Sequence, residues 1–358
     1  MAIACLYVEL MYMWKTIFFI FILLSIAYPT TSWSSDACST RAITAAAHVE
    51  VSDGSTFQIE TWFHSRDASA IRHIREPQQL IVVEGPQSWT QLGDDSRTGT
   101  DFHKLFALGH QFHAFMLHFE EVVSNVRRHE NILFDDEVRQ AISGDYPYGG
   151  VVHLIQGAGE SRPLGLLFEF PEDVVVSVKL DDWRSVGRLA LPFHLQIDDG
   201  QRVFDYYYSE IDVVPQSPLW FFDAIPAPPI DEVQVYRLHR KLLAAHCLGN
   251  ADMMADLSAP EVLTASRGKL NHITNDAIRE RFTALFQSVD YAAYHDLVVP
   301  TIDLSEDATV GWLGVNVQAE GQETKTGTLF SQQWAWVMMV KKIDDVWLHA
   351  GNASNRTN

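Results

Sequence analysis

Residues 334–352 read WAWVMMVKKIDDVWLHAGN, and this stretch decides the fold of the C-terminal part of the chain. Large apolar side chains recur at every second position over Trp334–Val340, which is the period of a β-strand with one buried face. The pair Asp344–Asp345 then marks a tight turn, because aspartate tolerates turn conformations. A second strand is expected over residues 346–352. The stretch therefore predicts an antiparallel hairpin of long strands.

The residues before this hairpin alternate between helical and strand patterns. A first helix begins behind Pro229 and ends at Gly249, the residue types that favour these two positions. Further helices are expected over residues 253–257 and 275–286, and a short strand lies between them. The remaining strands of this part are expected over residues 294–302, 309–319 and 328–341. We therefore predict an α+β domain of three helices and an antiparallel sheet over residues 230–354.

This order of elements resembles the nuclear-transport-factor-like superfamily, and within it the SnoaL-like branch. The residues that carry the resemblance read YRLHRKLLAAHCLGNADMMADLSAPEVLTASRGKL at 236–270 and KKIDDVWLHAGNASN at 341–355. The resemblance implies three helices packed on a strongly curved sheet, which together form a cone with an internal pocket. Members of the superfamily include ketosteroid isomerases, polyketide cyclases, dehydratases and domains that only bind or dimerise. The fold therefore does not name the function.

The expected first helix carries His239 and His246 on one stripe, together with Val235 and Leu242. In the resembled fold this helix faces the pocket, so both histidines are candidates to bind a ligand and weak candidates for a general base. Asp296 is a further candidate base. The alternative interpretation is that the aromatic residues fill the cone as core and that both histidines face the preceding domain. The other predicted ligand-binding residues are Arg267, Tyr294, Trp312, Trp334, Trp336 and Asn352.

Residues 40–214 are dominated by short alternating stretches. Asp53-Gly54 and Asp199-Gly200 each separate two such stretches, and Asp-Gly in this position is a strong hairpin signal. At least eight strands are expected, together with one long helix over residues 101–123. This composition predicts an antiparallel sheet that is wrapped around the helix or covered by it. Further strands of this part are expected over residues 80–83, 151–155, 164–170 and 174–180.

The last strands of this part also resemble a known family. The residues PLGLLFEF at 163–170 and VSVKLDDWRSVGRLALPFHLQIDDGQRVFDYYYSEIDV at 176–213 are similar to the closing strands of LolA-like lipoprotein-sorting proteins. The resemblance implies a half-barrel whose concave apolar face, covered by a helix, holds acyl chains. No motif for handing over a lipoprotein is matched, so a chaperone function is not implied.

The expected helix at 101–123 is rich in histidine. His103, His110 and Glu121 lie on the face opposite its apolar stripe, and His113 lies nearby. Imidazole and carboxylate groups on one helical face can chelate zinc or copper. Their spacing does not match the two histidines at i and i+4 that bind zinc on the helix of a zinc enzyme. The alternative to a metal site is a polar, solvated helix face that is rich in histidine. We therefore predict no metal and no cofactor, with these four residues as weak metal candidates.

The N-terminus has the layout of a secretory signal peptide over residues 1–34. Lys15 precedes an apolar stretch at 16–28, and small or polar residues follow. An uncleaved membrane anchor or a lipoprotein signal is the alternative. We expect an exported protein, periplasmic or secreted, in which Cys38 and Cys247 are the remaining cysteines and each is unpaired.

Five prolines lie within residues 215–229, and this density predicts a linker between two domains, because proline interrupts both helices and central strands. The formal charge of −20, from 46 acidic and 26 basic residues, argues against a nucleic-acid partner and against an anionic membrane surface. No phosphate-binding loop, serine-hydrolase elbow or paired-cysteine motif occurs. The sequence favours binding of a small hydrophobic or lipid-like molecule in one or both domains. The alternatives are an isomerase-, cyclase- or dehydratase-type enzyme and a module that forms a homodimer through its C-terminal domain.

Overall fold

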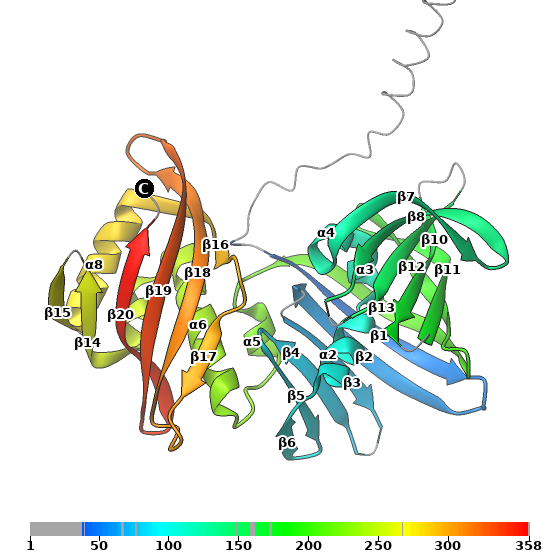
Figure 1. Ribbon diagram of the computed structural model, residues 1–358, viewed down its shortest axis with the longest axis horizontal. Helices are drawn as coiled ribbons and strands as arrows, with labels where there is room; N and C mark the ends of the chain where they lie inside the picture. The colour runs from blue at the N-terminus through cyan, green and yellow to red at the C-terminus, as the bar shows by residue number, and fades with distance from the viewer. Residues whose placement is uncertain are drawn as a thin grey trace, which may run out of the picture. The chain divides into compact units, whose positions relative to one another are not determined.

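The computed structural model describes most of the chain after Asp36, namely Cys38 and residues 40–65, 68–75, 77–147, 149–157, 162–171, 174–266 and 268–356. The predicted signal peptide and the candidate Arg267 lie outside these residues. Within them, no helix has both the length and the apolar character needed to cross a membrane. Two separate sheets account for the strands of the described chain (Figure 1).

The first sheet, called the N-terminal sheet below, has thirteen strands in the order β6-β5-β4-β3-β2-β1-β13-β12-β11-β10-β9-β8-β7. All neighbours pair antiparallel, and the first and last strands pair at the centre. The strands are β1 (Thr40–Val51), β2 (Thr56–Ser65), β3 (Ala68–Ile74), β4 (Gln79–Glu84), β5 (Gln87–Leu92), β6 (Asp95–Thr98), β7 (Ser124–Phe134), β8 (Glu137–Asp145), β9 (Val151–Gln156), β10 (Pro163–Phe170), β11 (Val174–Val186), β12 (Leu189–Asp198) and β13 (Val203–Gln216).

The predicted hairpin turns are confirmed in both sheets. Gly54 and Gly200 adopt φ angles of 85° and 81°, which glycine reaches without strain. Asp344 and Asp345 adopt φ angles of 49° and 63°, and they connect two long paired strands near the end of the chain. Consecutive residues with positive φ are typical of the two-residue turns that suit the twist of a hairpin.

The predicted long helix at 101–123 is wrong, because three short helices replace it. They are α2 (Asp101–Gly109), α3 (Phe112–Leu117) and α4 (Phe119–Val122). The chain leaves helical geometry at Gln111 and again at His118. The side-chain amide of Gln111 donates to the carbonyls of Ala70 and Ala107, so this break is tied to the sheet.

These helices connect the two edge strands, β6 and β7, and cover one face of the N-terminal sheet. Leu108 and Phe115 are completely buried against strand residues such as Leu166 and Leu195. The apolar residues that predicted one helix are therefore still buried together, because all three short helices contribute to a single core.

The second sheet, the C-terminal sheet, has the order β15-β14-β20-β19-β18-β16, with β17 also paired to β18. Strand β14 runs parallel to β20, and the other pairs are antiparallel. The strands are β14 (Ser258–Ser266), β15 (Lys269–Thr274), β16 (Val289–Asp296), β17 (Thr301–Leu304), β18 (Val310–Glu323), β19 (Leu329–Ile343) and β20 (Val346–Arg356). The helices of this part are α6 (Asp231–Cys247), α7 (Ala251–Asp256) and α8 (Asn275–Ser288).

The three helices match the predicted positions, but two details of the strand prediction are wrong. The predicted strand at 294–302 is two strands, β16 and β17, because residues 297–300 lie outside the strands. The last of them is Pro300, which cannot donate a backbone hydrogen bond to a neighbouring strand. Strand β15 was not expected at all, since most of its side chains are exposed and polar and show no alternation.

The predicted linker at 215–229 is a packed segment. Strand β13 continues through Pro215, which is tolerated there because β12 pairs only with the earlier residues of β13. A one-turn helix, α5 (Trp220–Ala224), follows. Its residues Phe221 and Phe222 are buried against side chains of β3, β4 and β5. Local proline content predicted the interruption of regular structure but not the burial of these aromatic residues.

A buried ion pair joins α6 to the N-terminal sheet. The guanidinium of Arg237 donates to both carboxylate oxygens of Glu84 at the end of β4, and one Arg237 nitrogen also donates to the carbonyl of Ile225. Both charged side chains are almost inaccessible to solvent. Next to the pair, the ring of Tyr236 fills the space beside Gly85, where any Cβ atom would overlap it. The two sheets are therefore connected by specific buried contacts.

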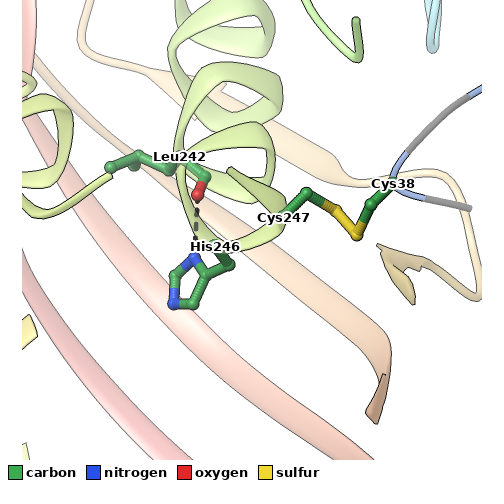
Figure 2. Close-up of a disulfide and its surroundings, with 4 residues drawn as sticks. All are labelled: Cys38, Leu242, His246 and Cys247. Atoms are coloured by element: carbon green, nitrogen blue, oxygen red, sulfur yellow. Dashed lines mark hydrogen bonds between the residues drawn. A yellow bond between two sulfur atoms is a disulfide. The ribbon is translucent and has the colours of Figure 1, made fainter. Parts of the chain in front are cut away.

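Cys38 and Cys247 form a disulfide, so the prediction that each is unpaired is wrong (Figure 2). The two Cα atoms lie 5.0 Å apart, although 209 positions separate the residues in the sequence. The backbone amide of Cys38 also donates to the carbonyl of Ala292 in β16. Sequence spacing could not predict the bond, because it depends on how the start of the first sheet meets the end of α6.

We expect loss of this disulfide to lower the free energy of unfolding by about 3–5 kcal/mol, since it closes a very long loop of the unfolded chain. Urea unfolding of the Cys247→Ser variant, compared with the wild type under oxidising conditions, measures the difference. Dithiothreitol should reduce the stability of the wild type and leave the variant unchanged. Equal stability of the two proteins under oxidising conditions would contradict the bond.

Candidate functional site

The C-terminal sheet has an inner face, which packs against α6, and an outer face on its other side. The inner face of β19 carries Trp334, Trp336, Met338 and Val340, as their alternation predicted. Asn352 lies opposite Met338 on β20 and shares this face. Tyr294 contributes from β16, where it contacts the ring of Trp336. The structure thus brings most of the predicted ligand-binding residues to one side of the sheet.

His239 on α6 forms a hydrogen-bonded pair with Asp296 at the end of β16. Nε2 of His239 lies 2.8 Å from Oδ1 of Asp296, and the guanidinium of Arg240 lies 3.3 Å from the other carboxylate oxygen. Burial alone would raise the pKa of Asp296, but the His239 and Arg240 charges hold this pKa below its ordinary value. The carboxylate is therefore ionised, and it holds the His239 ring by accepting a hydrogen bond from Nε2.

The burial of His239 limits what this pair can do. The residue is 0% exposed, and its Nδ1 atom has no hydrogen-bond partner among the described residues. A general base must come within hydrogen-bonding distance of the proton that it removes. The geometry therefore favours the alternative interpretation of His239 as an interior side chain over its role as a general base.

His246 lies in an aromatic cluster at the other end of α6. Its ring stacks on Tyr294 at a centroid distance of 4.2 Å, and it contacts Phe282, Phe286 and Tyr291 edge-on. Burial lowers the pKa of His246 to about 4, although its hydrogen bond to the Leu242 carbonyl opposes the shift. The imidazole is therefore neutral at pH 7 and a weak base.

The four metal candidates of the N-terminal part are not brought together. His103 accepts from the backbone amide of Thr100 and so caps α2, and His110 bonds to the carbonyl of Phe106. The remaining two, His113 and Glu121, contact Pro192 and His118 respectively. No group of three histidine, cysteine or acidic side chains that could hold a metal ion occurs among the described residues. The common helical face that suggested a metal site is lost because the helix is broken.

The outer face of the C-terminal sheet contains an open groove with a volume of about 830 Å³. It extends from the edge strand β15 across β14, β20, β19 and β18 to β17 and the loop before it. Its lining includes Ala265, Leu270, Val298, Val299, Thr301, Trp312, Gly314, Asn316, Ala335, Val337, Ala353 and Asn355.

Trp312 belongs to this groove and not to the inner face. It lies opposite Met339, whereas Trp336 lies opposite Val315, so the two tryptophans point to different sides of the sheet. The prediction that Trp312 joins Trp334 and Trp336 is wrong. Trp312 and Trp336 lie on neighbouring strands, so whether they share a face depends on the register between β18 and β19, which the sequence alone does not show.

Apolar side chains of the groove are unusually exposed. Leu270 is 71% exposed, Val298 58% and Val337 46%. A contiguous apolar surface of this kind marks a place where a soluble protein contacts something else. The sequence contains the signal, since residues 334–340 are apolar at every position and not only at alternate ones. The prediction of a strand with one buried face did not use the apolar residues Ala335, Val337 and Met339 on its other face.

The comparisons with known proteins concern the fold. The chain matches no family model, and it matches no curated protein. Among solved structures, it is similar to a LolA superfamily protein from Nitrosomonas europaea, with 11% identity and a TM-score of 0.38 over 54% of this chain and 96% of that one. It is also similar to a ketosteroid isomerase-like protein from Erwinia carotovora atroseptica, with 12% identity and a TM-score of 0.30 over 34% and 92% of the two chains. These are the two fold families that the sequence resembles.

Proposed function

We propose that the protein binds a small hydrophobic molecule in the groove on the outer face of the C-terminal sheet. The observation that supports the proposal is the groove itself, with its volume of about 830 Å³ and its mainly apolar lining. Clefts that bind small molecules typically measure about 300–1,000 Å³ and combine apolar walls with a few polar groups. The groove falls within this class.

The floor of the groove suits a flat or extended ligand. A ligand can lie close to the backbone of the sheet, because the floor is formed by Ala335, Ala353 and Gly314, which have small side chains or none. Trp312 and Val299 supply larger apolar surfaces at one end. Each CH₂ group that leaves water for such a surface contributes about 0.8 kcal/mol to binding.

Catalysis on the inner face is the second candidate function, and the His239–Asp296 hydrogen bond is the observation that favours it. Its weakness is the complete burial of His239. The two sites are on opposite faces of one sheet, so a substitution in the groove leaves the inner pair in place. Experiments on the groove therefore separate the two candidates.

Substitution of Ala353 by Trp is expected to weaken binding of the neutral probe N-phenylnaphthylamine at least about tenfold, because an indole on the groove floor occupies the ligand's place. Fluorescence titration of the probe measures the effect. Val310→Trp is the matched control, since Val310 lies on the same face of β18 but outside the groove lining.

Equal probe affinity of Ala353→Trp and the wild type would overturn the proposal. Sedimentation velocity adds a second test. A homodimer that Ala353→Trp dissociates would show that a second copy covers this face, and the small-molecule proposal would then be wrong.

We also propose that the protein works outside the reducing cytoplasm. The signal-like residues 1–34 support export. The Cys38–Cys247 disulfide supports it independently, because structural disulfides persist in oxidising compartments.

A further inference from the structure

We infer that the ligand is a rigid, uncharged ring molecule that carries a hydroxyl or carbonyl group at each end. Its rings lie over Ala335 in β19, and its two polar ends lie at Asn355 and Asn316 on the neighbouring strands. This inference rests on the proposed function and specifies the chemistry of the ligand. It is carried by the order in which the strand register places apolar and amide side chains on the outer face.

One row of paired residues crosses the groove from edge to edge. Each residue of the row pairs with the next one on the neighbouring strand, so all six lie on the same face of the sheet. The row consists of Leu270, Ala265, Ala353, Val337, Gly314 and Thr301, and all six line the groove. No member of the row carries a charge, and only the last has a polar side chain. The row therefore forms an apolar floor for a ligand.

A second row, next to the first, carries two amide side chains. Asn355 on β20 pairs with Ala335 on β19, and Ala335 pairs in turn with Asn316 on β18. All three residues line the groove. Two strand spacings of about 4.8 Å separate the asparagines, which places them about 10 Å apart along the row. The row thus has one hydrogen-bonding group on each side of an apolar centre.

The two amides are free to bind a ligand. Neither Asn316 nor Asn355 forms a side-chain hydrogen bond with another residue in the described part of the chain. Gln318 lies two positions beyond Asn316 on the same face and differs, because its amide donates to the Ser331 hydroxyl at 2.6 Å. Each asparagine amide can donate and accept, so a hydroxyl or a carbonyl group can pair with it. A ligand without such groups would cover the amides and leave them unpaired, which lowers its affinity.

The side chains that line the groove on its outer face are uncharged. Lys269 and Ser354 belong to the lining, but the register turns their side chains to the other face, because Lys269 is the neighbour of Leu270 and Ser354 pairs with Trp336. No other described lining residue is charged. An ion that leaves water needs an opposite charge to compensate for its lost hydration. The ligand that suits this face is therefore uncharged.

Trp312 lies beside the floor and favours rings over a flexible chain. Its indole is 39% exposed, and its Cζ3 atom lies 3.5 Å from the place that a Cβ atom would take at Gly314. Aromatic side chains pack against other rings in preferred edge and offset-stacked geometries. A rigid ring molecule also loses less conformational freedom on binding than a flexible chain does.

The test compares biphenyl with para-phenylphenol and para,para′-biphenol, which carry one and two hydroxyl groups at the ends of the same two rings. Each compound competes with bound N-phenylnaphthylamine at about pH 7, where phenols are uncharged. We expect the biphenol to bind the wild type at least about fivefold more tightly than biphenyl, and the phenylphenol to lie between them. The matching para,para′-dicarboxylate is charged and should bind at least about tenfold more weakly than the biphenol.

Substitution of either asparagine by leucine keeps the approximate size of the side chain and removes its hydrogen-bonding groups. Asn316→Leu and Asn355→Leu are each expected to weaken binding of the biphenol at least about threefold without weakening that of biphenyl. Gln322→Leu is the matched control, since Gln322 carries an amide on the same face of β18 but lies outside the groove lining. It should change neither affinity.

The outcomes separate this inference from the proposed function. If biphenyl binds as tightly as the biphenol and neither asparagine variant has an effect, the polar ends are wrong and hydrophobic binding in the groove stands. Equal affinities of the phenylphenol and the biphenol would overturn the ligand with two polar ends, and tight binding of the dicarboxylate would overturn the uncharged ligand. If N-phenylnaphthylamine does not bind the wild type, the proposed function fails and the inference fails with it.

Discussion

Acidification from pH 7 to pH 5 is expected to remove most of the stability of the protein. Six histidines with low pKa values are responsible, and burial is the largest cause of each shift. The pKa falls from 6.5 to about 3 for His64 and to about 4 for the others, which are His73, His110, His113, His246 and His349.

The sign of the effect follows from linkage. The unfolded chain binds protons at these histidines as the pH falls through 6.5, whereas the folded protein binds them only near pH 4, and at His64 near pH 3. Their contribution to stability is complete above pH 6.5 and is lost progressively below it. At pH 5 each histidine costs about 2 kcal/mol, and the six together cost on the order of 10 kcal/mol, which is comparable with the whole stability of a typical protein.

Urea unfolding at pH 7, 6 and 5 measures this loss directly. The variant His113→Gln removes one titrating group and should show a shallower dependence on pH. His272→Gln is its control, because His272 is exposed and should leave the dependence unchanged. A free energy of unfolding that stays constant from pH 7 to pH 5 would contradict the burial of these side chains.

Replacing Arg237 by Met is expected to lower the free energy of unfolding by about 3–5 kcal/mol, because it leaves the Glu84 carboxylate buried without its partner. The Arg237 hydrogen bond to Ile225 is lost as well. Urea denaturation at pH 7 measures the difference. Arg97→Met is the matched control, since Arg97 pairs with Asp95 at an exposed site and its loss should change stability by less than about 1 kcal/mol.

A double variant distinguishes the unpaired charge from a packing defect. Glu84→Leu combined with Arg237→Met removes both charges and should recover most of the stability that the single variant loses. If Arg237→Met is as stable as Arg97→Met, then the buried contact between α6 and the N-terminal sheet is not formed in solution.

Local patterns predicted the elements that local chemistry determines. The Asp-Gly turns, the limits of α6 and the alternation over Trp334–Val340 all follow from backbone preference or from one-sided burial, and each is present. These features depend on neighbours within a few positions. Tertiary contacts have little influence on them.

The features that the sequence did not predict depend on contacts between distant residues. The Cys38–Cys247 bond and the Glu84–Arg237 pair form only when two separate sheets are assembled. The first break in the histidine-rich helix also depends on a tertiary contact, since the side-chain amide of Gln111 donates a hydrogen bond to the carbonyl of Ala70 in β3. Such contacts leave no periodic trace in the sequence.

The sequence predicted a candidate site on the face of the C-terminal sheet opposite to the proposed groove. The resemblance to a cone-shaped fold implied a pocket on the inner face, and His239, His246 and Trp336 do lie on that side. The groove combines residues of β14, β15, β17, β18, β19 and β20 with the loop at Val298 and Val299. This combination cannot be inferred from the alternation of one strand.

Photolabelling tests the central claim, that a hydrophobic molecule binds in the groove of the C-terminal sheet, most directly. An uncharged hexadecyl chain that carries a diazirine would be bound, irradiated and located by peptide mass spectrometry. We predict that label is incorporated within residues 263–270, 297–301, 312–316 and 335–337, and that Ala353→Trp prevents it. Label confined to residues 239–246 and 282–294, on the inner face, would contradict the account.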